Sequence, residues 1–94
     1  MARAIWNGTI IAESASFETV EGNLYFPPCA LKMEHFEPSE RTTICSWKGT
    51  ASYYDIVVDG KRNEAAAWVY RNPKQEAANI RDMVAFWNGV TVER

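Results

Sequence analysis

Seven residues combine aromatic rings with positive charges or a thiol in three short stretches of the chain. They are Cys45, Trp47, Lys48, Tyr54, Trp68, Tyr70 and Arg71. Aromatic faces bind flat or cationic molecules, and the side chains of Lys and Arg bind carboxylates and phosphates. If the fold brings these stretches together, they form a groove suited to a small molecule that is flat or anionic. We therefore take these seven residues as the candidate ligand-binding site.

Each residue type in this candidate site has a separate task. The indoles of Trp47 and Trp68 would form the walls, and Tyr54 would supply a hydroxyl. Lys48 lies at a tight turn and would supply a positive charge, with Arg71 as a second cation. The alternative is structural: the rings fill a core that has only two Leu residues, and Lys48 is a solvated turn residue.

The thiol of Cys45 raises the question of catalysis. A thiolate beside an imidazole is a common activated nucleophile, and His35 is the one histidine of the chain. A cysteine within a strand is more often a small buried apolar residue. Because the sequence has neither a triad order nor an oxyanion-loop signature, no catalytic residue is predicted, and an enzyme that uses Cys45 stays an alternative. A second alternative is a homodimer whose interface the aromatic rings form.

Composition argues against several other classes of function. Ten Lys and Arg residues face twelve Asp and Glu residues, for a net charge of −2, and no basic cluster is present, so nucleic-acid binding is not expected. No apolar run approaches the ~20 residues of a membrane helix, and a cytoplasmic location is expected. Cys29 and Cys45 lack the Cys-x-x-Cys spacing of a structural zinc site, so neither a metal nor a cofactor is predicted.

The elements that must position these residues are mainly β-strands. Val and Ile together number 13 against two Leu, and branching at Cβ favours a pleated sheet over a helix. Asn-Gly and Asp-Gly pairs favour two-residue hairpin turns. Every Gly of the chain ends a pair typical of a turn: Asn7-Gly8, Glu21-Gly22, Lys48-Gly49, Asp59-Gly60 and Asn88-Gly89. We expect a single β-rich domain over residues 1–94, with two antiparallel sheets built from hairpins.

Strands are expected on both sides of these turns, at residues 3–6, 9–13, 17–20, 24–26, 41–47, 50–58, 61–70, 83–87 and 90–93. The last two should pair with each other across Asn88-Gly89. One short α-helix is expected near residues 73–81, because Asn72 offers an N-cap, Pro73 suits the first helical position and Gln75 suits the capping box.

The central hairpin decides which candidate residues share a surface. If Lys48-Gly49 is a two-residue turn, Trp47 lies opposite Thr50. Side chains alternate between the two faces of a strand. Cys45, Trp47 and Tyr54 would then project from the same face.

Several segments carry a resemblance to a known family. They are Tyr25-Phe26-Pro27-Pro28, Cys45-Ser46-Trp47-Lys48-Gly49, Ala51-Ser52-Tyr53-Tyr54, Ala66-Ala67-Trp68-Val69-Tyr70 with Pro73, and Val84-Ala85-Phe86. Over nearly the whole chain they resemble domain-of-unknown-function family 427, a group of small, mostly bacterial proteins. The resemblance implies a β-tent fold, shared with the thalidomide-binding domain of cereblon and with zinc-containing guanine-nucleotide exchange factors. Those relatives usually hold zinc between Cys-x-x-Cys hairpins, which this chain lacks, so the resemblance implies the fold without the metal.

The chain departs from the family's usual pattern at two positions. Ser46 stands where the family usually has Pro, and Trp87 stands where it usually has Tyr, so a role tied to either position is open. An older label for the family suggests a nucleotidyltransferase. The sequence has no glycine-rich phosphate loop, and Asp55 and Asp59 lack the spacing that places two carboxylates on one metal. That activity therefore stays an alternative only.

Overall fold

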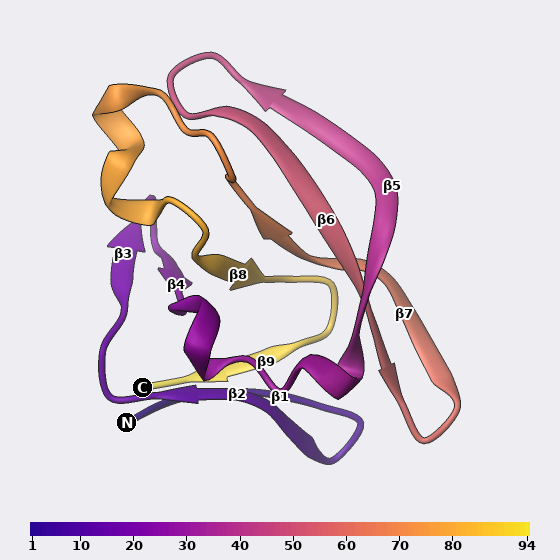
Figure 1. Cartoon of the computed structure of the whole chain (residues 1–94). Helices are drawn as coiled ribbons and strands as arrows, with labels where there is room; N and C mark the ends of the chain where they lie inside the picture. The colour runs from indigo at the N-terminus through magenta and orange to yellow at the C-terminus, as the bar shows by residue number, and fades with distance from the viewer.

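The computed structural model describes all residues from 1 to 94 and consists mainly of antiparallel strands joined by tight turns (Figure 1). The strands are β1 (Ala2–Trp6), β2 (Thr9–Ser14), β3 (Glu18–Val20), β4 (Asn23–Tyr25), β5 (Phe36–Cys45), β6 (Gly49–Val58), β7 (Lys61–Val69), β8 (Val84–Phe86) and β9 (Thr91–Glu93). Three 3-10 helices complete the chain: η1 (Pro28–Ala30), η2 (Met33–His35) and η3 (Gln75–Ile80). The predicted mainly β fold is confirmed, and the likeness to a β-tent stays a prediction.

The strands form three sheets where two were predicted. β2-β1-β9 make a three-stranded sheet, β3 and β4 a two-stranded sheet, and β5-β6-β7-β8 a four-stranded sheet. Two backbone hydrogen bonds between Phe26 and Val84, of 2.8 and 2.9 Å, connect the end of β4 to β8. The chain termini lie side by side because β1 and β9 are neighbours (Figure 1).

The predicted pairing of residues 83–87 with 90–93 is wrong. β8 lies between β7 and Phe26, so both of its edges are occupied. At Asn88-Gly89 both residues have positive φ, 56° and 92°, but this turn carries the chain to β9, which pairs with β1. The same turn chemistry makes a true hairpin at Asn7-Gly8, as predicted.

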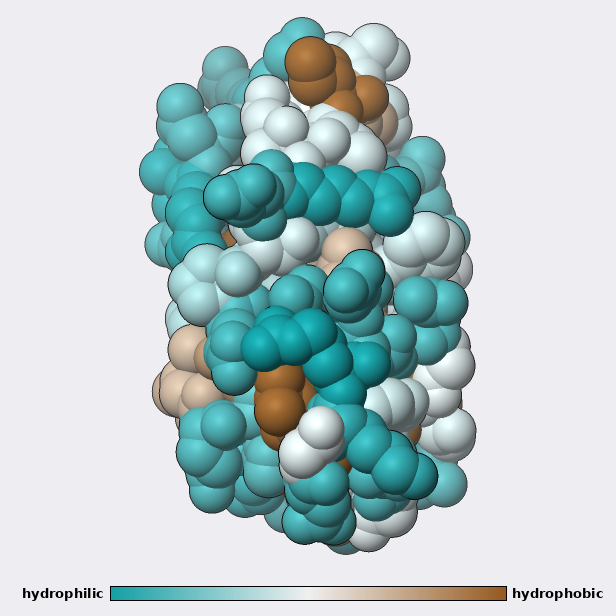
Figure 2. Space-filling model, turned by 90° about the vertical axis from the view of Figure 1, so that its right-hand side faces the viewer, coloured by the Kyte–Doolittle hydropathy of each residue, from teal (hydrophilic) through white to brown (hydrophobic).

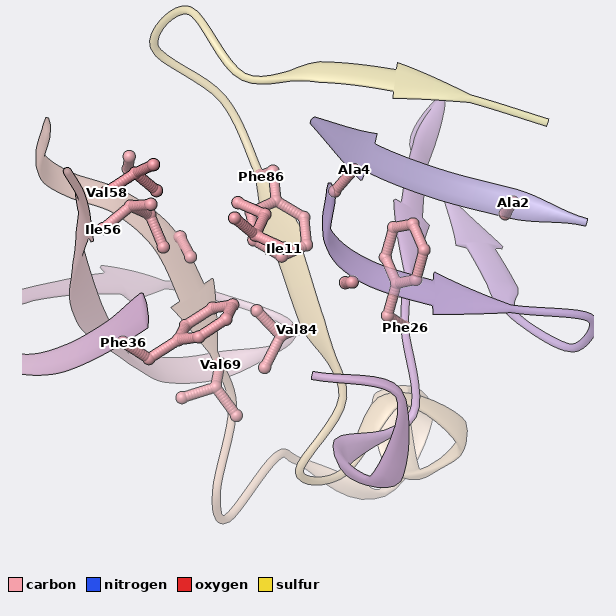
Figure 3. Packing of buried hydrophobic residues seen from close by; sticks show 13 residues of the cluster. Ala2, Ala4, Ile11, Phe26, Phe36, Ile56, Val58, Val69, Val84 and Phe86 are labelled. Carbon is pink, nitrogen blue, oxygen red and sulfur yellow. The ribbon is translucent and has the colours of Figure 1, made fainter. Parts of the chain in front are cut away.

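The main core lies between the three-stranded sheet and one face of the four-stranded sheet (Figure 3). The ring centroids of Phe26 and Phe86 are 5.5 Å apart with the planes at 76°, and those of Phe36 and Phe86 are 6.0 Å apart. Ala2 and Ala4 of β1 are fully buried and occupy little volume, which lets the two sheets approach. Because each aromatic ring buries roughly 150–250 Å², these three rings supply much of the apolar contact between the sheets.

The opposite face of the four-stranded sheet carries most of the candidate site. Tyr53 pairs with Trp68, and Trp68 pairs with Ala85, so these three side chains project from this face. A second group of buried residues covers part of it, and we call this group the second cluster: Tyr25, Ala51, Tyr70, Ala77, Ile80 and Ala85.

The predicted α-helix near residues 73–81 is instead the 3-10 helix η3. Lys74 is extended (φ −64°, ψ 160°), and its backbone N–H donates to the carbonyl of Lys48 at 2.9 Å, so a helix cannot begin at Pro73. Ala77 departs from helical geometry (φ −117°, ψ 22°). The remaining run is too short for a stable α-helix, and the burial of Ala77 and Ile80 holds the segment on the sheet.

Candidate functional site

The tip of the central hairpin is a three-residue loop, residues 46–48, between β5 and β6. Cys45 pairs with Gly49, so the predicted register, with Trp47 opposite Thr50, is wrong. Gly49 has a φ of +113°, a conformation that residues with a Cβ rarely adopt. A glycine at this position therefore lets the chain leave the loop and enter β6.

The segment after β7 holds this loop in place. Lys74 donates from its backbone N–H to the carbonyl of Lys48 at 2.9 Å and from Nζ to the carbonyl of Ser46 at 2.7 Å. The backbone of residues 72–74 lies 3.5 to 3.7 Å from the point where a Cβ on Gly49 would stand. These contacts join segments far apart in the sequence, and they favour a loop that local turn chemistry does not predict.

We call the face of the four-stranded sheet that carries most of the candidate site the candidate face. In the observed register Tyr53, and not Tyr54 as predicted, projects from this face. The hydroxyl of Tyr53 lies 3.0 Å from that of Thr43 across the hairpin. Tyr54 projects from the opposite face and packs edge-to-face on Phe36, with centroids 5.6 Å apart. Its hydroxyl accepts a hydrogen bond of 3.0 Å from Arg71. Tyr54 and Arg71, both predicted site residues, therefore lie apart from the other candidates.

An open pocket of about 240 Å³ lies on the candidate face. One cation and four aromatic rings line it: Lys48, Tyr53, Trp68, Tyr70 and Trp87. Ligand pockets typically measure about 300–1,000 Å³. This pocket is below that range, which suits a molecule of one or two rings.

Lys48 supplies the charge of the pocket and is buried, with 9% of its side chain exposed. Its ammonium forms an ion pair with Glu21, which lies in the turn between β3 and β4. The same Nζ is 5.3 Å from the ring centroid of Trp47 and 5.6 Å from that of Tyr70, within cation–π range. The alternative that Lys48 is a solvated turn residue is therefore wrong.

The protonation states follow from this burial and pairing. Burial alone would lower the pKa of Lys48, but the hydrogen bond to Glu21 and the neighbouring phenols raise that pKa above its usual value. The hydrogen bond from Lys48 lowers the pKa of Glu21. Burial raises the pKa of Tyr25 and of Tyr70, so both phenols stay neutral at pH 7. The pocket thus combines the positive charge of Lys48 with the neutral phenol of Tyr70.

Tyr25 fixes the orientation of Trp68. The indole Nε1 donates to the hydroxyl of Tyr25 at 3.1 Å, and the two rings meet edge-to-face with centroids 6.2 Å apart. Tyr25 is fully buried and comes from β4. The small two-stranded sheet therefore positions one of the two indoles that line the pocket.

Trp87 forms a wall that the sequence analysis missed. Its Nε1 donates to the carbonyl of Ala65 at 2.7 Å, and 43% of the residue is exposed. The guanidinium carbon of Arg41, also missed, lies 5.0 Å from the ring centroid of Tyr53 and 5.6 Å from that of Trp87. The pairing of Ala85 with Trp68 puts Trp87, two positions further on, on the same face as Trp68. The sequence analysis missed it because it paired residues 83–87 with 90–93.

Cys45 lies half-buried next to the loop, as a free thiol. Hydrogen bonds from the backbone N–H groups of Lys48 and Trp47 lower the pKa of this thiol. His35 is bound elsewhere, because its Nδ1 lies 3.0 Å from the carbonyl of Val57, near the far end of β6. The thiol therefore has backbone donors and a nearby ammonium but no imidazole. No three His, Cys, Asp or Glu side chains gather in a way that could hold a metal ion.

The seven predicted site residues thus fall into three groups. Lys48, Trp68 and Tyr70 line the pocket. Trp47 and Cys45 pack against the second cluster but do not line the pocket. Tyr54 and Arg71 lie on the opposite face of the sheet and form the third group. Ligand binding by any of them stays a prediction.

No helix of the chain has the length and apolar character that crossing a membrane requires.

Comparison with known proteins supports the family resemblance. A search of curated proteins gave no match. One protein-family model, described as "Domain of unknown function (DUF427)", matches residues 1–94, the full length. The chain belongs to the DUF427 family.

Proposed function

We propose that this protein binds a flat small molecule with an anionic group in the pocket lined by Lys48 and the four rings. The observation that carries the proposal is the ammonium of Lys48, nine-tenths buried in a wall that is otherwise aromatic. A buried charge is unfavourable without a partner. The partner here, the Glu21 carboxylate, is 52% exposed and can turn into solvent when another anion enters.

The rings favour a planar ligand. Trp68 and Trp87 bring indole rings to the pocket, and stacked or edge-to-face contacts between rings contribute about 0.5–1.5 kcal/mol beyond the area they bury. Tyr53 and Tyr70 add two further rings with polar ends. A single or fused ring with one carboxylate, such as indole-3-carboxylate, is the simplest molecule with the required size, shape and charge.

A small enzyme that uses Cys45 is the second candidate. The lowered pKa of this thiol, next to Lys48, favours it. A cysteine nucleophile also needs a group that moves protons, and the imidazole of His35 is held by the carbonyl of Val57 instead. We therefore prefer binding. The nucleotidyltransferase alternative has no comparable observation in its favour.

A homodimer formed through aromatic rings is a weaker candidate. The exposed large apolar residues belong to five separate segments: Met1, Ile10, Met33, Ile44 and Trp87. Figure 2 shows the right-hand side of Figure 1 as mostly hydrophilic, with small apolar patches set apart from each other. Stable dimers use broad contiguous interfaces. We therefore assign the pocket to a small molecule and not to a second copy of the chain.

The proposed location is the cytoplasm. Cys29 and Cys45 are both free in the fold. Free thiols are usual in reducing compartments, where disulfides rarely persist. The ligand would accordingly be a cytoplasmic metabolite.

Isothermal titration with indole-3-carboxylate and its neutral amide, indole-3-carboxamide, tests the proposal. We expect the carboxylate to bind about tenfold more tightly than the amide, because only the carboxylate forms an ion pair with Lys48. Lys48→Met should abolish this difference while its side chain still fills the wall. Lys61→Met, at the exposed start of β7, makes the same charge change away from the pocket and should leave the difference intact. Failure of the native chain to bind either compound at millimolar concentration would contradict the proposal.

A further inference from the structure

An irregularity in β5 brings Arg41 to the pocket. β5 changes its register against β6 between Pro38 and Thr42, and residues 39–41 lie opposite a single residue of β6, Tyr53. Bulges of this kind bend a strand and redirect a side chain. Here the guanidinium carbon of Arg41 lies 5.0 Å from the ring centroid of Tyr53.

Arg41 and Lys48 contact different walls of the same pocket. Arg41 lies over the rings of Tyr53 and Trp87, both of which line the pocket. Lys48 lies over Tyr70, a third lining ring. The pocket therefore has one cation in its wall and a second one over two of its other rings.

The guanidinium of Arg41 has its donors free. The ion pairs of the chain are made by Arg3, Lys48 and Arg62, and none by Arg41. The hydrogen bond of Arg41 to a side chain comes from its backbone N–H, which donates to Ser39. A guanidinium over aromatic faces keeps its N–H groups available, and their fork matches a carboxylate or phosphate with two parallel hydrogen bonds.

We propose that Arg41 is a second anion-binding residue of the pocket, and that the ligand is accordingly an aromatic dianion. One carboxylate binds Lys48, the ring lies among the aromatic walls, and a second carboxylate or a phosphate binds Arg41. This inference rests on the proposed function and extends it, because it names the class of ligand. The inference predicts that the chain binds dianions more tightly than monoanions of the same ring.

Titration calorimetry with four probes measures this preference. Benzoate is the monoanion, benzene-1,3-dicarboxylate and benzene-1,4-dicarboxylate vary the spacing of two carboxylates, and 3-phosphonooxybenzoate replaces one carboxylate by a phosphate. We expect at least one of the last three to bind about tenfold or more tightly than benzoate, since each adds a charge-assisted hydrogen bond. The tightest of them tells whether Arg41 receives a carboxylate or a phosphate.

Two matched variants assign the preference to one residue. Arg41→Gln should reduce the affinity for the dianion to that for benzoate, with a change of less than about twofold in benzoate affinity. Arg71→Gln removes the same charge from an arginine whose guanidinium carbon lies 5.5 Å from the ring centroid of Tyr54, on the other face, and should change neither. Both arginines are exposed, so both variants should keep the far-ultraviolet circular dichroism of the native chain.

The possible failures are distinct. If the native chain binds benzoate and all dianions equally, or if Arg41→Gln and Arg71→Gln lower dianion affinity to the same extent, the assignment of Arg41 is wrong and the proposed function stands. If the native chain binds neither these probes nor indole-3-carboxylate, the proposed function is wrong as well.

Discussion

The ammonium of Lys48 is paired with the carboxylate of Glu21, across 27 positions of the sequence. This ion pair joins the tip of the central hairpin to the turn of the β3–β4 hairpin. Its two ends differ in exposure, because the side chain of Lys48 is 9% exposed and that of Glu21 is 52% exposed. Glu21 therefore competes with any anion that enters the pocket and is the partner that can move away.

Glu21→Gln should strengthen the binding of indole-3-carboxylate. The ligand would no longer displace an ion pair, and a pair with one exposed partner contributes only modestly, so we expect a gain of a few fold. Titration calorimetry measures the gain. Glu34→Gln, on an exposed residue of η2, is the control and should have no effect. An affinity that stays equal or falls in Glu21→Gln would show that Glu21 does not compete with the ligand.

The same ion pair predicts how stability changes with pH. The hydrogen bond from Lys48 lowers the pKa of Glu21 from 4.5, so the folded chain takes up this proton less readily than the unfolded chain. The stabilisation is present above pH 4.5 and is lost as the pH falls through the lowered pKa. In thermal unfolding near pH 7, the Tm of the native chain should be higher than that of Glu21→Gln. The two Tm values should approach each other in strong acid. A Tm difference independent of pH would contradict this prediction.

Trp68→Phe should destabilise the fold by about 1–3 kcal/mol, because the buried hydroxyl of Tyr25 loses its donor. Urea unfolding of Trp68→Phe, Tyr25→Phe and the double variant completes a double-mutant cycle. We expect the double variant to lose less free energy of unfolding than the two single variants lose together, since it removes both members of the hydrogen bond. Additive effects would mean that this hydrogen bond does not contribute to holding the indole.

Ala65 carries backbone strain beside the pocket. It has a φ of +51°, is 7% exposed, and donates its backbone N–H to Asp55 Oδ1 at 2.8 Å where β7 shifts register against β6. Ala65→Gly should stabilise the fold by up to about 1 kcal/mol, and Ala65→Val should destabilise it by about 1–3 kcal/mol. Ala66→Gly, next in β7 and without positive φ, is the control in urea unfolding and should be destabilising. Equal losses of stability in Ala65→Gly and Ala66→Gly would show that the backbone of Ala65 is not strained.

Local chemistry predicted the parts of the fold that depend on neighbours in the sequence. The turn at Asn7-Gly8 joins β1 to β2, and the turn at Asp59-Gly60 joins β6 to β7, as expected. Prediction was wrong where distant segments decide the outcome. Lys74 fixes the loop at 46–48, and Phe26 occupies the edge of β8 that was assigned to residues 90–93.

The candidate site shows the same division. Lys48, Trp68 and Tyr70 were found because cations and rings are close together in the sequence, and all three line the pocket. Tyr53 was missed because a wrong hairpin register moves a strand residue to the other face. Trp87, whose role the sequence left open, lines the pocket.

The indole N–H signals in a nuclear magnetic resonance titration test the central claim most directly. The chain has four Trp residues, so a spectrum of ¹⁵N-labelled protein reports each indole separately. On addition of indole-3-carboxylate, we predict progressive, saturable shifts for the indoles of Trp68 and Trp87 and none for that of Trp6, which packs against the main core. Unchanged signals for Trp68 and Trp87, at concentrations that saturate any shift elsewhere, would contradict the account.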